Sequence, residues 1–322
     1  MLEKIKKTLH SINLSTPQGI QRTIWLVAAA LIVNLLLFGG YYYWDRYIHL
    51  GDQSQVEMTI DELKKAIRDD PNDPEKRVML AEYYLTANLP AKSLEQTDQV
   101  LEAYPEHEGA LLLSGIAFVR QNQPEKAIDP LKHFIYLRKD LPLASSDNAL
   151  EMSYYFLGES YLKVGRPLDA IDPLEAAIQI SATDADALYQ LGLAYNATEK
   201  PEQALLYFKR AVRLVPNFVE AYGGMIESYT TLEQPEFIAY SRGMQAFSMG
   251  DLETARTNLE YAAQVLPDHS PTFLGLALTY EQLEQFDYAL IAINHALELE
   301  PDNFAAQQTL GRLQATVAGQ ES

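Results

Sequence analysis

Apolar and small residues recur along most of this chain with a period of about 34 residues, between Asp73 and Asn303. The clearest copy of the pattern is the series Leu188, Leu191, Gly192, Tyr195, Ala204, Phe208, Ala211 and Pro216. Within each unit the apolar positions follow helical spacing in two blocks, separated by a short break that contains Gly, Asn or Pro. Each unit therefore predicts an antiparallel pair of α-helices.

Small and aromatic residues at fixed offsets explain why such helices pair. Small residues such as Gly158 and Ala177 let helix backbones approach closely, and aromatic residues such as Tyr161 fill the space between neighbouring helices. The offsets closely resemble the tetratricopeptide repeat, with a small residue at 8, Tyr at 11, Ala at 20 and 27 and Pro at 32. The resemblance covers about four-fifths of the chain. It implies an all-α fold, an α-solenoid of helix-turn-helix repeats over residues 56–318.

The repeats have definite starts and two departures from regularity. Full copies begin near Pro74, Glu108, Glu151, Ala185 and Ser270, residues 304–318 form a capping helix, and residues 319–322 are a tail. About nine inserted residues, 139–148, form a spacer or a contact loop. The array is irregular near 219–250, where one second-type helix is missing and residues 236–249 take both parts.

A second regional signal lies before the repeats. Residues 24–44 form an apolar run whose only strongly polar member is Asn34, long enough to span a bilayer as a helix. Trp and Tyr residues at both ends of the run fit the headgroup boundary. We therefore predict a transmembrane helix at 24–44, a short basic N-terminal segment at 1–23 and a linker at 45–55. A cleaved signal peptide or a buried soluble helix are the alternatives.

The flanking charges predict the orientation of this span. The basic residues are Lys4, Lys6, Lys7 and Arg22 before it, and Arg46, Lys64 and Lys65 after it. The count favours a cytoplasmic N-terminus. The repeats would then lie outside the cytoplasm, on a bacterial plasma membrane.

The net charge and the absence of catalytic motifs restrict the functions that this sequence predicts. The net charge is −19, and residues 51–322 hold 20 basic against 42 acidic residues, which disfavours nucleic acid as a partner. The six histidines are scattered without a metal-ligand spacing, there is no cysteine, and no phosphate-binding or nucleophile motif occurs. We therefore expect no enzyme activity, no cofactor and no metal.

The resemblance also implies where a partner would bind, because first helices line the concave surface of similar proteins. Mapping the ligand-facing offsets onto this chain gives a candidate groove of apolar residues interrupted by acidic and polar ones. Its members are Val78, Glu82, Leu112, Ile116, Tyr155, Glu159, Leu162, Tyr189, Leu193, Asn196, Tyr240, Met244 and Phe247. Such a groove suits a helix or extended peptide with apolar anchors and some basic residues. The Lys, Arg and Asn offsets that grip a C-terminal carboxylate in one subgroup hold other residues here.

Together these signals predict a single-pass membrane-anchored scaffold. Its repeats would bind other proteins and help to assemble or stabilise a membrane protein complex. Two alternatives stay open: an accessory subunit integrated in a larger membrane complex through the helix at 24–44, and a receptor or regulator whose repeats face the cytoplasm.

Overall fold

The computed structural model describes residues 17–47 and 54–320, and it divides into two units, residues 1–62 and 63–322. The predictions for residues 1–16 and 321–322, and for part of the linker at 45–55, concern residues outside those that the structure describes. In the first unit the main element is the helix α2 (Pro17–Tyr47). The helix α3 (Gln55–Asp69) begins in the first unit and ends in the second.

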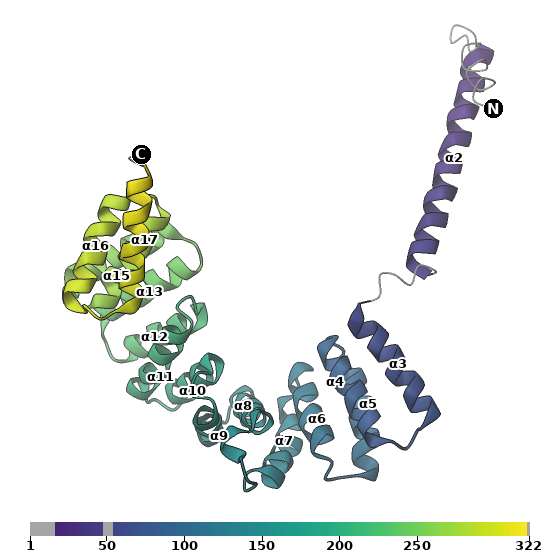
Figure 1. Cartoon of the computed structure of the whole chain (residues 1–322), viewed down its shortest axis with the longest axis horizontal. Coiled ribbons are helices and arrows are strands. Elements are labelled where there is room, and N and C mark those ends of the chain that lie inside the picture. The colour runs from purple at the N-terminus through teal and green to yellow at the C-terminus, as the bar shows by residue number, and fades with distance from the viewer. Residues whose placement is uncertain (1–16, 48–53, 321–322) are drawn as a thin grey trace. The chain divides into compact units, whose positions relative to one another are not determined.

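Helices make up all of the regular secondary structure in the described part of the second unit (Figure 1). They are α4 (Pro74–Thr86), α5 (Pro90–Ala103), α6 (Glu108–Arg120), α7 (Pro124–Arg138), the 3-10 helix η2 (Ala144–Ser146), α8 (Asn148–Lys163), α9 (Pro167–Ile180), α10 (Ala185–Ala197), α11 (Pro201–Leu214), α12 (Val219–Thr231), α13 (Pro235–Ser248), α14 (Leu252–Val265), α15 (Ser270–Gln282), α16 (Phe286–Leu299) and α17 (Phe304–Gln320).

The two helix types begin differently. The first helices α4, α8 and α10 follow Asp73, Asp147 and Asp184, whose carboxylates accept hydrogen bonds from the free backbone N–H groups of the opening turn. The second helices α5, α7, α9 and α11 instead begin with proline, whose missing N–H costs nothing at this position. The inserted residues before α8 form η2 and a left-handed turn at Leu143.

A left-handed residue ends each first helix and turns the chain into the next helix. These residues are Asn88, Asn122, Gly165, Glu199, Glu233, Gly250 and Glu284. The backbone N–H after the turn donates back into the helix, as from Lys200 to the carbonyl of Tyr195 at 3.0 Å. The turns are spaced by the repeat length or by that length plus the insertion, except that Glu233 and Gly250 are only half a repeat apart.

The half-repeat falls on α13. This helix begins with Pro235 as second helices do, yet it ends in the left-handed Gly250 as first helices do. It packs against α12 before it and α14 after it. First helices contact the first helix of the next pair from α4 through α12, and this line of contacts resumes at α13, α15 and α17. The array is therefore interrupted by one helix at this point.

The core runs along the array and not around one centre. One buried cluster extends from Val119 to Leu313, and a smaller one around Leu85 and Ile116 lies before it. Glycines in first helices receive large side chains from second helices: a Cβ at Gly192 would lie 2.5 Å from Phe208. The face of each first helix that carries small residues is therefore buried against a neighbouring helix. Repeating this contact along the array forms the continuous core of a solenoid.

The helix α2 contains the predicted span at 24–44. Described side chains such as Ile24, Leu35 and Phe38 are exposed, while several others in this range lie outside the described residues. Where side chains are described, no helix is both long and apolar enough to cross a membrane. The structure therefore does not support the predicted transmembrane helix.

Candidate functional site

The candidate site is the line of first helices α8, α10 and α12, which contact one another in turn. We call the following side chains the first-helix face: Glu151, Tyr155, Glu159, Asp186, Tyr189, Leu193, Glu220 and Glu227. They occupy matching turns of three helices because the repeat returns them at nearly the same offset. The face thus alternates half-buried aromatic and aliphatic side chains with carboxylates.

Two half-buried tyrosines form the aromatic part of this face. Tyr155 on α8 lies edge-on to Phe156 at 5.2 Å, and Tyr189 on α10 lies 5.1 Å from Phe218 and 5.9 Å from Phe208. Burial, together with nearby carboxylates, raises the pKa of both phenols, so both stay neutral hydrogen-bond donors and acceptors at physiological pH.

Carboxylates surround these rings. Partial desolvation, and then the charges of Asp184 and Glu220, raise the pKa of Asp186. Glu159 is paired with Lys163 at 2.7 Å within α8. Glu220 and Asp186 are exposed, and in the described part of the chain neither forms a salt bridge. The face is therefore negative, and its accessible carboxylates are free to attract a cation.

Asn196 has a structural role at the edge of the first-helix face. Its Nδ2 donates to the carbonyl of Gly224 at 3.2 Å and to Glu227 at 3.4 Å, while its Oδ1 accepts from the hydroxyl of Ser228 at 2.7 Å. This amide therefore fixes α10 against α12, and most of its hydrogen-bonding capacity is already used.

A pair of carboxyl groups lies where α8 meets the start of α10. Burial and a hydrogen bond with Asp184 raise the pKa of Glu151 to about 7. Oε1 of Glu151 is buried and has no hydrogen-bond partner. Asp184 meanwhile accepts from the backbone N–H groups of Asp186 and Ala187. The pair is thus held in place by the fold, while part of its hydrogen-bonding capacity is unused.

The predicted groove residues divide by burial. Half-buried are Val78, Leu112, Tyr155, Glu159, Leu162, Tyr189, Leu193, Asn196 and Phe247; exposed is Glu82; buried in the core are Ile116, Tyr240 and Met244. Met244 packs against Gly275 of α15, and Tyr240 against His269 at 4.7 Å. These buried side chains support the array and do not offer a surface. Four of the predicted residues, Tyr155 and Glu159 from α8 and Tyr189 and Leu193 from α10, lie on the first-helix face.

Four acidic residues of this region were missed by mapping groove offsets: Glu151, Asp184, Asp186 and Glu220. They lie in or just before the opening turns of first helices, positions normally read as helix caps. The signal that could have found them is internal. When α7 and α9 are aligned, α9 lacks the basic residue with which α7 ends. The position without this residue lies next to the acidic start of α10.

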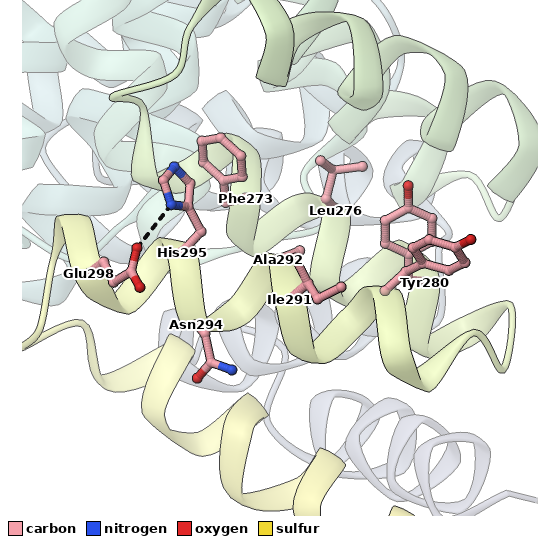
Figure 2. Close-up of a pocket in the computed structure, with 9 residues that line it drawn as sticks. Phe273, Leu276, Tyr280, Ile291, Ala292, Asn294, His295 and Glu298 are labelled. Atoms are coloured by element: carbon pink, nitrogen blue, oxygen red, sulfur yellow. Dashed lines mark hydrogen bonds and ion pairs between the residues drawn. The ribbon is translucent and has the colours of Figure 1, made fainter.

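A separate hollow lies on α15 and α16 (Figure 2). Figure 2 shows His295 beside Phe273 and joined to Glu298 by a dashed line. The two ring centroids are 4.2 Å apart, and Nδ1 of His295 lies 3.2 Å from Oε2 of Glu298. Tyr280, at the other end, donates to Glu260 at 2.8 Å. The hollow is lined by structural contacts and holds no arrangement of an acid, a base and a nucleophile. Over the described residues, no group of three or more His, Asp and Glu side chains is placed to hold a metal ion.

Comparison with known families identifies the repeats. Profiles of the tetratricopeptide repeat match residues 78–134, 185–218 and 271–303. Three segments of the chain therefore match the tetratricopeptide repeat, and the predicted all-α solenoid of helix pairs is confirmed by the order and contacts of the helices. The matched segments include α10 and α11, which carry Tyr189, Leu193 and Phe208.

Curated relatives are similar over part of their length. The chain is 25% identical over 233 residues to "Protein CTR9 homolog" of Arabidopsis thaliana, covering 69% of this chain and 19% of the relative. It is 27% identical to "Peroxisomal targeting signal receptor" of Yarrowia lipolytica (46% and 29% covered) and 23% identical to "BBSome complex member BBS4" of Bos taurus (82% and 49% covered). The chain thus spans less than half of the length of each.

Solved structures of repeat proteins are also similar. YrrB, described as a TPR protein with an unusual peptide-binding site, aligns with a TM-score of 0.48 and 21% identity, over 66% of this chain and 96% of that one. A tetratricopeptide repeat protein from Parabacteroides merdae aligns with a TM-score of 0.47 and 13% identity, over 87% of this chain and 98% of that one.

Proposed function

We propose that this chain is a protein-binding scaffold whose first-helix face receives a segment of a partner protein. The observation that carries the proposal is the combination of half-buried tyrosines on α8 and α10 with two exposed carboxylates that form no salt bridge within the described residues, Asp186 on α10 and Glu220 on α12. Aromatic rings contribute binding area at a low cost in conformational entropy, and the carboxylates add selectivity for charge. The eight side chains of the face place no nucleophile next to a base, which favours a binding role over catalysis.

The chemistry of the face defines the partner. Leu193 and the two tyrosines suit apolar anchors of a helix or an extended peptide. Asp186 and Glu220 favour basic residues beside those anchors and repel nucleic acid. The partner segment is therefore amphipathic and cationic.

Membrane attachment is a separate part of the proposal, and it rests on the sequence of residues 24–44. The described apolar side chains of α2 are exposed, up to 76% for Leu35, and such a surface needs a lipid or protein cover. With a cytoplasmic N-terminus the repeats would lie outside the cytoplasm of a bacterial cell. Carbonate extraction of native membranes tests attachment: recovery of the full chain in the supernatant would remove this part of the proposal. Protease access to the repeats in sealed cells or spheroplasts distinguishes an outer location from a cytoplasmic one.

The scaffold function is tested by charge reversal on the full-length chain. We expect Asp186→Lys combined with Glu220→Lys to abolish recovery of the native partner in a detergent pull-down followed by mass spectrometry. The matched control reverses the exposed Glu125 and Glu202 on second helices, which changes the net charge equally. Partner recovery that survives the first variant would show that the first-helix face is not the binding site.

The accessory-subunit alternative predicts a different outcome. If α2 holds the partner, both charge-reversal variants retain it, and the change Leu35→Arg on α2 releases it. Membrane-complex assembly through the repeats requires the opposite pattern.

A further inference from the structure

Arg138 neutralises two carboxylates at the junction of α6, α7 and α8. Its Nε donates to Oδ2 of Asp147 at 2.7 Å, and its Nη1 donates to Oε2 of Glu108. Glu108 begins α6 and Asp147 caps α8, so one guanidinium ties together the starts of two consecutive first helices. The side chain of Arg138 is 31% exposed, so the place it fills is open to solvent.

The next junction lacks this arginine. The second helices α7 and α9 align from their opening residues, Pro124 and Pro167, and both carry proline again six residues later. In this alignment Ser181 takes the place of Arg138. A serine hydroxyl is short and uncharged, so it cannot bridge two carboxylates.

The two carboxylates themselves are retained at this junction. Glu151 on α8 aligns with Glu108 on α6, sixteen residues before the proline in each case. Asp184 caps α10 just as Asp147 caps α8, by accepting from two backbone N–H groups. The second junction therefore keeps the anionic half of the bridge without its cation.

Glu151 and Asp184 lie next to each other without a cation between them. Burial and Asp184 raise the pKa of Glu151 to about 7, and its buried Oε1 has no hydrogen-bond partner. Within the described residues, neither carboxyl forms a salt bridge with Lys or Arg. A pair of this kind gains more from a guanidinium than a solvated carboxylate would, because the guanidinium removes like-charge repulsion at a partly desolvated site.

The surroundings of the pair suit an arginine. Tyr155 lies one helical turn after Glu151, and the charges of Asp184 and Asp186 reach its ring. A guanidinium is planar, donates to two carboxylates at once and stacks on aromatic faces, whereas an ammonium group is a compact, strongly hydrated point charge.

We propose that an arginine side chain of the partner segment bridges Glu151 and Asp184, in the place that Arg138 fills one repeat earlier. The rest of the segment lies along Tyr155 and Tyr189. This inference rests on the proposed function and adds to it the identity of one anchor residue and the pair that receives it.

The first test uses a defined probe and the full-length chain. Acetyl-Gly-Arg-Gly-amide is titrated against the protein and followed by peptide-observed NMR, beside matched peptides in which citrulline or lysine replaces arginine. We expect the arginine peptide to bind about tenfold more tightly than the citrulline peptide, as charge-assisted bidentate bonds predict. Equal binding of the arginine and citrulline peptides would overturn the proposal. Lysine binding as tightly as arginine would reduce the site to general charge attraction and would also overturn it.

Variants of the chain locate the binding. Ser181→Arg restores the internal bridge, so we expect it to raise the melting temperature and weaken the arginine peptide about tenfold. Ser181→Gln is the uncharged control and should change neither quantity. Asp184→Asn keeps a good N-cap while removing the charge, so it tests the site even if Ser181→Arg fails to fold. Unchanged affinity in Asp184→Asn would overturn the proposal.

Recovery of the native partner distinguishes failure of the arginine site from failure of the scaffold function. If Asp186→Lys with Glu220→Lys releases the partner while Ser181→Arg retains it, the scaffold function stands and the arginine site is wrong. If neither variant releases the partner, both proposals fail.

Discussion

The ring of Phe208 on α11 occupies the space that a side chain at Gly192 on α10 would need. A Cβ at position 192 would lie 2.5 Å from Cε1 of this fully buried ring, and Gly224 of α12 closes on the same ring. We expect Gly192→Ala to lower the free energy of unfolding by about 1–3 kcal/mol. Overpacking should outweigh the roughly 1 kcal/mol that Ala gains over Gly in a helix. Urea denaturation followed by circular dichroism measures the change.

Gly311 on α17 provides the matched control for this prediction. A Cβ built at this position meets nothing within 4 Å, so only the helix propensity changes. Gly311→Ala should therefore raise the free energy of unfolding by up to about 1 kcal/mol. Equal stabilisation by both alanines would show that the contact between α10 and Phe208 is looser than the geometry indicates.

Glu151 makes stability depend on pH. Its pKa rises from 4.5 to about 7 on folding, so the folded chain binds more protons than the unfolded chain between these values. Its stabilising contribution is fully present below the unfolded pKa and is lost as the pH rises through the folded pKa. We expect Glu151→Gln, which keeps a donor toward Asp184, to gain stability relative to the natural chain over this window. Melting curves across the window measure it, and a constant difference between the two proteins would contradict the assigned shift.

The helical repeat could be predicted from the sequence because its signals are local and recurrent. Tyr195 and Ala204 return at fixed offsets in several units, and the structure places them in a first and a second helix. The fate of individual groove positions could not be predicted in this way. Tyr240 and Met244 have ligand-facing offsets, yet the interruption at α13 turns both into the core. Ile116 is buried too, although α6 lies in the regular part of the array, so an offset alone does not decide whether a side chain is exposed.

The pair of Glu151 and Asp184 could not be predicted from repeat offsets, for a different reason. Whether Glu151 is an ordinary solvated carboxylate depends on Asp184, thirty-three residues later, and on the absence of a cation between them. Burial and mutual repulsion are properties of the assembled junction. In the sequence, Ser181 stands at the repeat position that Arg138 holds one repeat earlier. The consequence of this difference becomes visible only when the two junctions are compared in three dimensions.

Removing the Arg138 bridge should destabilise the array measurably. Arg138→Gln leaves Glu108 and Asp147 close together without their shared cation. We expect a loss of about 1–2 kcal/mol, more than a typical surface pair contributes, because two carboxylates and a helix cap are involved. The control is Arg166→Gln: Arg166 pairs with Asp169 alone, both side chains are about half exposed, and its guanidinium lies over the Tyr161 ring as that of Arg138 lies over the Phe134 ring. Its loss should therefore cost less than about 1 kcal/mol. Similar costs for the two variants would show that the bridge adds nothing beyond an exposed pair.

His269 should give a pH dependence of the opposite sign to that of Glu151. Its ring lies 4.7 Å from Tyr240 and 5.5 Å from Phe237, and its Nδ1 is 2.7 Å from the hydroxyl of Thr272. Burial, and then the Lys209 ammonium, lower the pKa of His269 from 6.5 to about 4, so the unfolded chain binds more protons between these values.

The contribution of His269 is present above the unfolded pKa and is lost as the pH falls toward about 4. We expect the natural chain to lose up to about 3 kcal/mol over this window through His269 alone. His269→Gln loses ring packing at every pH but lacks this further decline, so its stability curve should be flatter on the acid side. Denaturation midpoints at several pH values distinguish the two effects. An equally steep acid decline in His269→Gln would show that the ring is solvated and that the junction of α13 and α15 is open to water.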